Sequence, residues 1–112
     1  MKIVLVGAGG SGISNLAYIL DELGYTNLLA IDGYESQITQ ALRDKGIPLI
    51  IGHGKYELQP DDILIYSEAV VESPEVQTAF RLKLEHQQPL KIWNYFQFLG
   101  EMSKYFRTVG FS

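Results

Sequence analysis

A glycine-rich turn near the N-terminus places the strongest constraint on the fold of this chain. Residues 3–6 form a short apolar run, and the residues from Gly7 to Gly12 then read GAGGSG. In this GxGxxG spacing the first glycine permits a tight turn out of a strand, the second lets the backbone approach an anion, and the third lets a helix pack closely on the strand. The pattern predicts a strand, a turn and a helix whose N-terminus faces two phosphate groups.

The residues of this turn are the first candidates for ligand contact. We expect its backbone N–H groups to face a diphosphate, and we expect Ser11 to add a hydroxyl or an N–H group. The alternative for Ser11 is a structural role as the N-terminal cap of the helix. The predicted diphosphate contacts are Gly7, Gly9, Gly10, Ser11 and Gly12.

The residues after the turn complete a βαβ unit. Apolar residues recur at three- and four-residue spacing over residues 13–23, which predicts a helix that ends at Gly24. A second apolar run at residues 27–31 predicts a strand that leads into Asp32. An acidic residue at this place hydrogen-bonds a ribose hydroxyl in dinucleotide-binding domains. The alternative is a turn aspartate before a glycine, and both interpretations stay open.

The remainder of the chain alternates between strand and helix patterns. Short apolar runs predict three further strands, at residues 49–51, 63–66 and 89–93. Capping residues and apolar spacing predict three further helices, which begin at Ser36, Ser73 and Asn94. Strands that alternate with helices form parallel sheets with right-handed crossovers. We therefore predict an α/β fold, a three-layer α/β/α Rossmann-like domain with a mainly parallel five-stranded sheet, whose switch point lies at the glycine turn.

Two helices carry predicted core faces. For the helix that begins at Ser73, the expected inner residues are Val76, Ala79, Phe80 and Leu84. The last helix carries a second apolar set, which we expect to be core, or in part a surface that faces another domain. Its members are Phe96, Phe98, Leu99, Met102 and Phe106.

Two polar segments follow predicted strands, where ligands of parallel sheets bind. His53 lies between two glycines after the third strand, and it has either a structural role or a ligand contact. Ser67 and Ala69 follow the fourth strand, and their hydroxyl and backbone groups either meet a nucleotide or cap the next helix. Ser67 has no GxSxG elbow, so we predict no catalytic residue. Asp61 and Asp62 predict a turn, and we predict no metal site.

Composition excludes several classes of function. The 112 residues, 46% of them hydrophobic, suffice for a single domain with a buried core. The net charge of −4 would repel a nucleic-acid backbone, so we predict no nucleic-acid partner. The lack of cysteine excludes a disulfide framework and fits a reducing compartment. No segment shows the pattern of a secretion signal or a membrane span, so we expect a cytoplasmic protein without a membrane partner.

A set of short motifs resembles the N-terminal domain of the Mur ligase family along the whole chain. The motifs are the opening GAGGSGISNLAYILDELGY, the Asp32 turn, the IGHG phrase at residues 51–54, the YSEAV string at residues 66–70 and the Pro74-Glu75 step. The resemblance is strongest to members that join UDP-N-acetylmuramate to L-alanine or recycle muropeptides. It implies that this domain binds UDP-N-acetylmuramate, with Asp32 near the uridine moiety and His53 in contact with the ligand.

The resemblance also implies a longer parent enzyme. Mur ligases have a central ATPase domain and a C-terminal domain for the amino acid, and they form an acyl phosphate with ATP and Mg²⁺ during the synthesis of peptidoglycan precursors. Their GTxGKT/S loop follows a strand similar to residues 108–112. We expect residues 1–106 to form the UDP-sugar-binding domain and residues 107–112 to begin a truncated central ATPase domain. Without the Lys and hydroxyl of that loop, this chain should bind no ATP and be inactive alone.

Two segments depart from the family pattern, and two other functions remain open. Residues 95–97 read Tyr-Phe-Gln where the family has an Arg-Ala-Glu-like step, and Glu68 replaces the second Ser of a Ser-Ser-Ala string. The main alternative is an NAD(H)-binding Rossmann domain of a dehydrogenase or regulatory protein, which uses the same turn but does not require the later motifs. The other alternative is an interaction module that keeps the fold as a scaffold.

Overall fold

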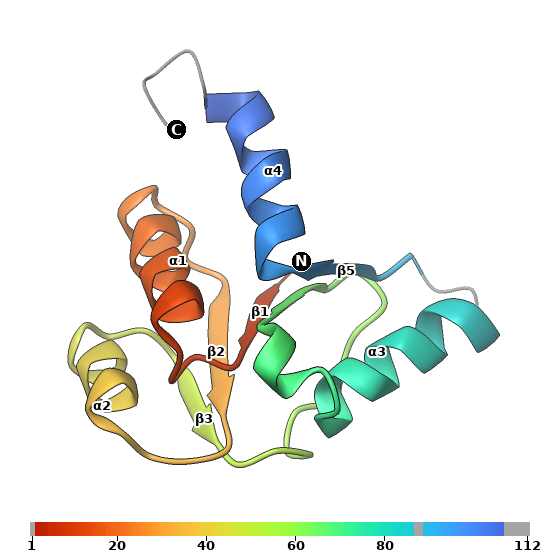
Figure 1. Cartoon of the computed structure of the whole chain (residues 1–112), viewed down its shortest axis with the longest axis horizontal. Helices are drawn as coiled ribbons and strands as arrows, with labels where there is room; N and C mark the ends of the chain where they lie inside the picture. Colours follow the sequence, from red (N-terminus) through yellow and green to blue (C-terminus); the bar gives the residue numbers. More distant parts are fainter. Residues whose placement is uncertain (1, 87–88, 107–112) are drawn as a thin grey trace.

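A five-stranded parallel sheet lies at the centre of the computed structural model, which describes residues 2–86 and 89–106 (Figure 1). Its order is β3-β2-β1-β4-β5, and every neighbouring pair is parallel. The Rossmann-like fold predicted from the sequence is confirmed, whereas residues 108–112, which resemble the strand before the GTxGKT/S loop, lie outside the described residues. The strands are β1 (Ile3–Val6), β2 (Leu28–Asp32), β3 (Leu49–Ile51), β4 (Ile63–Tyr66) and β5 (Lys91–Asn94).

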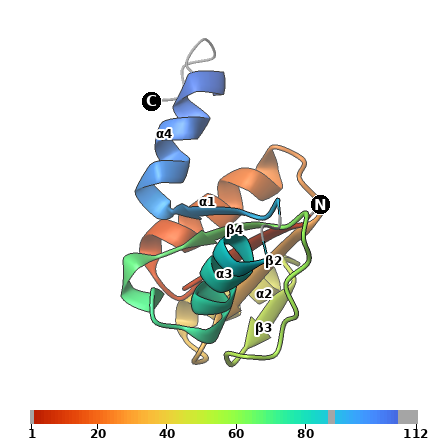
Figure 2. The same ribbon diagram turned by 90° about the vertical axis from the view of Figure 1, so that its right-hand side faces the viewer.

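Helices cover both faces of the sheet. Helices α1 (Ser11–Glu22) and α2 (Gln37–Asp44) lie on one face, and α3 (Pro74–Glu85) lies on the other, as Figure 2 shows with α3 toward the viewer. A short 3₁₀ helix, η1 (Glu68–Val70), follows β4. Helix α4 (Tyr95–Phe106) starts directly after β5 and projects away from the sheet in both views. No helix in the described part of the chain has the length and apolar character to cross a bilayer.

Strand β1 is the centre of both hydrophobic cores. Its four residues are between 0% and 5% exposed, as predicted for a parallel strand that is covered on both faces. Alternate side chains point to opposite faces, so Ile3 and Leu5 pack with α1 whereas Val4 and Val6 pack with α3. From β1 the chain builds β2 and β3 on one side and β4 and β5 on the other. The turn after β1 is therefore the switch point, as expected.

The helix boundaries follow the local signals of the sequence. The Ser36 side chain accepts a hydrogen bond from the Thr39 N–H at 3.2 Å, and the Thr39 hydroxyl accepts one from the Ser36 N–H at 2.8 Å. Gly24 and Gly46 follow α1 and α2 with φ of 93° and 88°, the left-handed conformation of a helix end. Ser73 occupies the cap position of α3, but its buried Oγ has no hydrogen-bond partner among the described residues.

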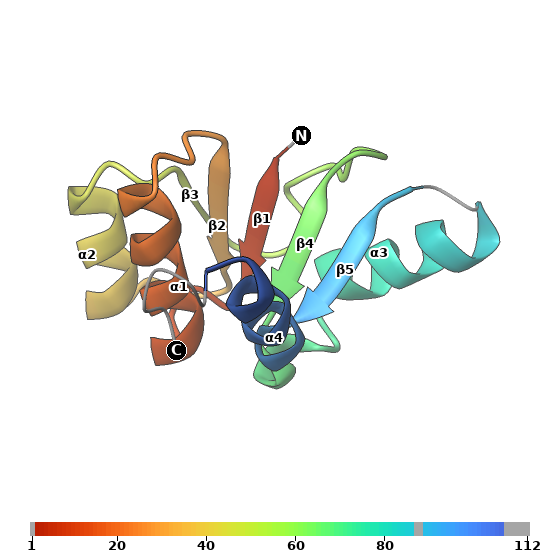
Figure 3. The ribbon, with the colours of Figure 1, turned by 90° about the horizontal axis from the view of Figure 1, so that it is seen from above.

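The predicted inner face of α3 is wrong at one residue. Val76 and Ala79 are fully buried, and Phe80 packs edge to face on Tyr66 with ring centroids 6.0 Å apart. The last turn of α3 extends beyond the sheet (Figure 3), and Leu84 in this turn is 78% exposed. Leu82 packs against the core instead.

The predicted apolar face of α4 is likewise buried at some residues and exposed at others. Phe98 packs against the core on the α1 side, whereas Phe96 is 72% exposed. Leu99 is half-buried. The side chains of Met102 and Phe106 lie outside the described residues.

The central position of β1 predicts a large cost for shortening one of its side chains. Leu5→Ala removes a fully buried side chain from the core on the α1 side. We expect it to lower the free energy of unfolding by about 2–5 kcal/mol, through lost transfer energy and the remaining cavity. Urea denaturation measures this loss. Leu84→Ala is the matched control, and it should change the stability by less than about 0.5 kcal/mol because that side chain is exposed.

Candidate functional site

The glycine turn is tied to the end of β2. The N–H groups of Gly7 and Ala8 both donate to the carbonyl oxygen of Ile31, at 2.8 and 3.1 Å, and the Gly10 N–H donates to the Gly7 carbonyl oxygen at 3.0 Å. Gly7 has φ of 93°, and a Cβ there would lie 3.1 Å from the Cβ of Ser67. Only glycine meets both conditions, so the first glycine has the turn-forming role that the sequence predicted.

Helix α1 begins without a side chain that caps it. The cap position is Gly10, with φ of −85° and ψ of 151°, and Ser11 is the first helical residue, so the cap interpretation of Ser11 is wrong. The first backbone hydrogen bond of the helix runs from the Ser14 N–H to the Gly10 carbonyl oxygen at 3.1 Å. The N–H groups before Ser14 have no acceptor within the helix, and they are the groups that an anion would bind. The Ser11 side chain lies outside the described residues.

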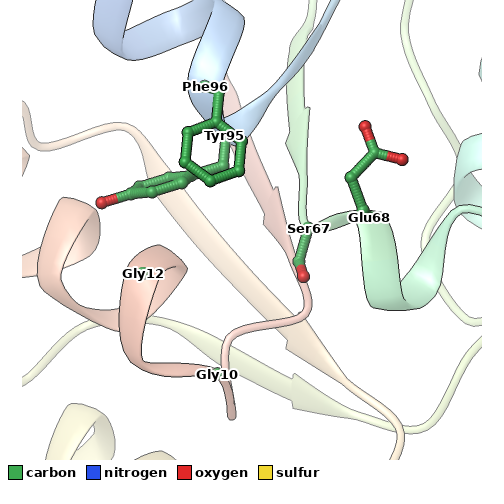
Figure 4. A pocket seen from close by; sticks show the side chains of 6 residues that line it. All are labelled: Gly10, Gly12, Ser67, Glu68, Tyr95 and Phe96. Atoms are coloured by element: carbon green, nitrogen blue, oxygen red, sulfur yellow. The ribbon is translucent and has the colours of Figure 1, made fainter.

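A pocket of about 400 Å³ opens beside this helix start (Figure 4). It lies where the carboxyl ends of β1, β4 and β5 meet, and the close view shows the ring of Phe96 and the hydroxyl of Ser67 on opposite sides of the opening. The rings of Tyr95 and Phe96 pack edge to face with centroids 5.3 Å apart. The lining residues are Gly10, Gly12, Ser67, Glu68, Tyr95 and Phe96.

Gly12 of α1 lies directly against the ring of Tyr95, the first residue of α4. A Cβ on Gly12 would lie 3.0 Å from the Cε2 atom of Tyr95. The third glycine of the motif was predicted to permit close packing of a helix on a strand, and here it also admits an aromatic ring of α4. The aromatic wall of the pocket therefore depends on this glycine.

The residues after β4 contribute both a cap and a charge. The Ser67 Oγ accepts a hydrogen bond from the Ala69 N–H at 3.3 Å, which confirms the capping interpretation, and Ser67 also lines the pocket. The exposed Glu68 accepts a hydrogen bond from the Asn94 Nδ2 at 2.9 Å, which joins the ends of β4 and β5. Burial, and then the charge of Glu68, raise the pKa of the Tyr66 hydroxyl, so this phenol stays neutral at physiological pH.

Asp32 holds the glycine turn from the side of β2. Its Oδ2 accepts a hydrogen bond from the Gly9 N–H at 2.6 Å, and its Oδ1 accepts one from the Tyr34 N–H at 3.0 Å. A Cβ on Gly9 would lie 2.7 Å from that Oδ2. The turn interpretation of Asp32 is therefore confirmed, and the second glycine brings the backbone close to a carboxylate of the protein. Each oxygen keeps a further lone pair, so contact with a ribose hydroxyl remains a prediction.

His53 is tied to a buried carboxylate on α3. Its Nδ1 lies 2.8 Å from Oε1 of Glu75, and Oε2 of Glu75 accepts a hydrogen bond from the Gly54 N–H at 2.5 Å. The Glu75 side chain is 1% exposed and the His53 side chain 27%. The other edge of the ring lies against Gly33, where a Cβ would be 3.1 Å from both Cδ2 and Nε2. These contacts join the ends of β2 and β3 to the start of α3.

The structure thus divides the candidate residues into two neighbouring groups along one edge of the sheet. Gly10, Gly12 and Ser67 line the pocket, and Asp32 and His53 lie at the ends of β2 and β3. Gly9 joins the groups, since it precedes Gly10 and bonds Asp32. Within the described ranges, no three His, Asp or Glu side chains gather in a way that would hold a metal ion.

Sequence reasoning missed three residues of this site. The sequence identified Glu75 only as part of a motif and Tyr95 only as a departure from a family pattern, and it placed Phe96 in the apolar face of the last helix but not in a ligand site. The signal for Glu75 was its place after Ser-Pro at a helix start, where a carboxylate interacts well with the helix dipole. Its burial against His53 is a tertiary contact that no local pattern encodes.

A comparison of the sequence with known proteins identifies the family of this chain. Residues 2–107 match the sequence model described as "Mur ligase family, catalytic domain". This chain belongs to the Mur ligase family. The resemblance drawn from the glycine turn and the later motifs is confirmed.

Individual members of the Mur ligase family align with most of the chain. It is 35% identical over 109 residues to the UDP-N-acetylmuramate--L-alanine ligase of Caldicellulosiruptor saccharolyticus, covering 96% of this chain and 22% of that protein. The corresponding ligase of Clostridium perfringens is 33% identical over 104 residues, covering 92% of this chain and 21% of its own length. That of Aquifex aeolicus is 38% identical over 81 residues, covering 71% and 18%. The chain spans about a fifth of the length of the first two relatives.

The contact between Gly12 and Tyr95 predicts an unusual response to a helix-favouring substitution. Alanine in place of glycine within a helix normally stabilises a protein by about 0.5–1 kcal/mol. In Gly12→Ala the new methyl group meets the Tyr95 ring at 3.0 Å, and the cost of overpacking, about 1–3 kcal/mol, exceeds that gain. Thermal and urea denaturation should show a net loss of stability.

Gly100→Ala is the matched control for this substitution. Gly100 lies in α4, and beyond the neighbouring backbone of that helix no atom of the described residues lies within 4 Å of a Cβ built there, so this variant should be stabilised. Adding Tyr95→Ala should relieve the defect of Gly12→Ala in a double-mutant cycle. Equal stabilisation by both glycine substitutions would show that the ring does not restrict Gly12.

Proposed function

We propose that this chain is the UDP-sugar-binding domain of a ligase that joins UDP-N-acetylmuramate to L-alanine. The observation that carries the proposal is the pocket of about 400 Å³ between the uncapped start of α1 and the ends of β4 and β5. Ligands of open α/β sheets bind at this switch point, and pockets for small ligands measure about 300–1,000 Å³. The names of the relatives supply the identity of the sugar nucleotide.

The geometry suggests how such a ligand would lie. The diphosphate would accept hydrogen bonds from the N–H groups of the first turn of α1, where the helix dipole favours negative charge. The Ser67 hydroxyl lines the same pocket and offers a further donor. Tyr95 and Phe96 would cover one apolar side of the bound molecule. Of the other predicted contacts, Gly7 and Gly9 lie in the turn before α1, Ser11 is the first residue of α1, and Ala69 lies in η1.

The same proposal places the domain in a longer enzyme. Residues 1–106 would form the UDP-sugar-binding domain, and residues 107–112 would begin a central ATPase domain that binds ATP and Mg²⁺. A C-terminal domain would bind the amino acid, and the reaction would supply peptidoglycan precursors in the cytoplasm. This chain alone would bind the sugar nucleotide without carrying out the ligation.

A titration separates this function from the NAD(H)-binding alternative. We expect UDP-N-acetylmuramate, added to the ¹⁵N-labelled chain, to shift the amide signals of Gly10, Gly12 and Ser67. UDP should shift the signals of the glycine turn, and uridine without phosphates should not, because the turn is proposed to bind the diphosphate. NADH should leave the signals of Tyr95 and Phe96 unchanged. Shifts with NADH and none with the sugar nucleotide at millimolar concentration would favour the alternative.

The negative charge of Glu68 predicts a gain of affinity when it is neutralised. Glu68→Gln keeps an oxygen that accepts from Asn94 but removes a charge at the edge of the pocket. Repulsion between unit charges at 4 Å in water is about 1 kcal/mol, so we expect the affinity for UDP-N-acetylmuramate to rise about two- to fivefold. Calorimetric titration in about 0.1 M salt, where the Debye length is about 10 Å, measures this change.

Glu22→Gln is the matched control for the charge. Glu22 is exposed and lies at the opposite end of α1, about 16 Å along the helix from its first residue. This distance exceeds the screening length, so the control should leave the affinity unchanged. An equal gain in both variants would mean that the net charge of the chain, and not Glu68, opposes the ligand.

A further inference from the structure

Glu75 is a buried carboxylate that the proposed diphosphate contacts do not use. It is the second residue of α3, and its side chain is 1% exposed. A buried carboxylate is costly unless donors satisfy its oxygens. Both oxygens have a partner: the Gly54 N–H donates to Oε2 at 2.5 Å, and Nδ1 of His53 lies 2.8 Å from Oε1. The two partners are adjacent in the loop after β3, so this carboxylate organises that loop.

These contacts fix the chemical form of a neutral His53. A carboxylate oxygen only accepts hydrogen bonds, so Nδ1 must carry the proton that it shares with Glu75. A neutral imidazole that donates from Nδ1 has an unprotonated Nε2, which is an acceptor. The Nε2–Cδ2 edge of the His53 ring lies over Gly33, the residue directly after Asp32. The His53 side chain is 27% exposed. An acceptor nitrogen is therefore held at the end of β2, against the residue that follows Asp32.

We propose that Glu75 is a positioning residue that fixes the orientation and the tautomer of His53. Through this contact Nε2 is presented as an acceptor to an O–H or N–H donor on the nucleoside part of the ligand. Ribose hydroxyls and the N–H of uracil are donors of this kind. The inference rests on the proposed function: with the diphosphate on the first turn of α1 and the sugar in the pocket beside Tyr95, the nucleoside would extend along the glycine turn toward Asp32, which binds the Gly9 N–H, and toward His53.

The isosteric variant Glu75→Gln tests the tautomer directly. The Gly54 N–H is only a donor, so it retains the oxygen of the introduced side-chain amide as its acceptor. The amide nitrogen then faces Nδ1 of His53 and donates to it. We expect the ring to change to the Nε2–H tautomer, which presents a donor where the wild-type chain presents an acceptor.

Nitrogen chemical shifts report this change without any ligand. The chain has two histidines, and the exposed His86 serves as an internal reference. In ¹⁵N spectra at about pH 8.5, where an ordinary imidazole is neutral, His53 should be protonated on Nδ1 in the wild-type chain and on Nε2 in Glu75→Gln. The exposed Glu72 lies in the turn before α3, and Glu72→Gln should leave the Nδ1–H form unchanged. Retention of the Nδ1–H form in Glu75→Gln overturns the proposal.

Binding measurements show whether the tautomer matters to the ligand. We expect Glu75→Gln to weaken UDP-N-acetylmuramate about tenfold, since a donor then faces a donor, while Glu72→Gln has no effect. In a His53→Ala background, Glu75→Gln should add no further loss, because Glu75 acts through the ring. An equal loss in that background overturns the positioning role.

A second variant keeps the inference testable if Glu75→Gln fails to fold. In Gly33→Ala the new Cβ lies 3.1 Å from Nε2 and displaces the ring, but the contact with Glu75 is not altered chemically. We expect weaker binding with the Nδ1–H tautomer retained, and unchanged affinity overturns the proposed place of Nε2. A wild-type chain that binds no uridine diphosphate ligand overturns the proposed function itself. If the wild-type chain binds the ligand and the affinity of Gly33→Ala or Glu75→Gln is unchanged, the proposed function stands and only the inference about Glu75 and His53 is overturned.

Discussion

The burial of β1 on both faces is the constraint on which the rest of the structure depends. The register of this strand with β2 and β4 sets Val6 beside Ile31 and Tyr66, so the loops after all three strands leave the sheet at one level. The glycine turn then lies in contact with the Asp32 turn on one side and with Ser67 on the other. A one-residue slip of β1 would exchange its two buried faces and also separate these loops. Stability and the candidate site therefore rest on the same strand register.

The candidate site has two parts with different states of hydrogen bonding. At the ends of β2 and β3 the protein satisfies its own groups, because Asp32 accepts from two backbone N–H groups and Glu75 from His53 and Gly54. At the start of α1 the first-turn N–H groups have no acceptor within the helix, and a pocket lies beside them. The protein's own hydrogen bonds thus organise the first part without a ligand, which would lower the entropy cost of the binding proposed there. The second part offers the donors that an anion requires.

Local sequence patterns predicted the features whose causes are local. The β-branched run of β1, the glycines after α1 and α2 and the Ser36 cap each depend on residues within a few positions, and the structure confirms them. Leu84 followed the helical spacing but lies where α3 has passed the sheet, and its exposure depends on the length of β5 and β4. Glu75 and His53 are 22 residues apart, so their contact arises only from the folded arrangement. The family resemblance predicted where the candidate site lies, but the contact between Glu75 and His53 could be found only in the structure.

The departures from the family pattern change how a diphosphate would be stabilised in this chain. The six described residues of the pocket include Glu68 and no Lys or Arg. A helix N-terminus carries an effective charge of about +0.5, which is smaller than the charge of the carboxylate alone. Asn94 binds Glu68, and Figure 4 shows that carboxylate turned away from the glycine turn, which reduces its repulsion of a ligand. The recognition proposed for this domain would then depend on hydrogen bonds from N–H groups and on contact with Tyr95 and Phe96, more than on ion pairing. Such binding should depend less on salt than binding by a pocket that pairs the diphosphate with an arginine, since exposed ion pairs are the interactions that salt screens.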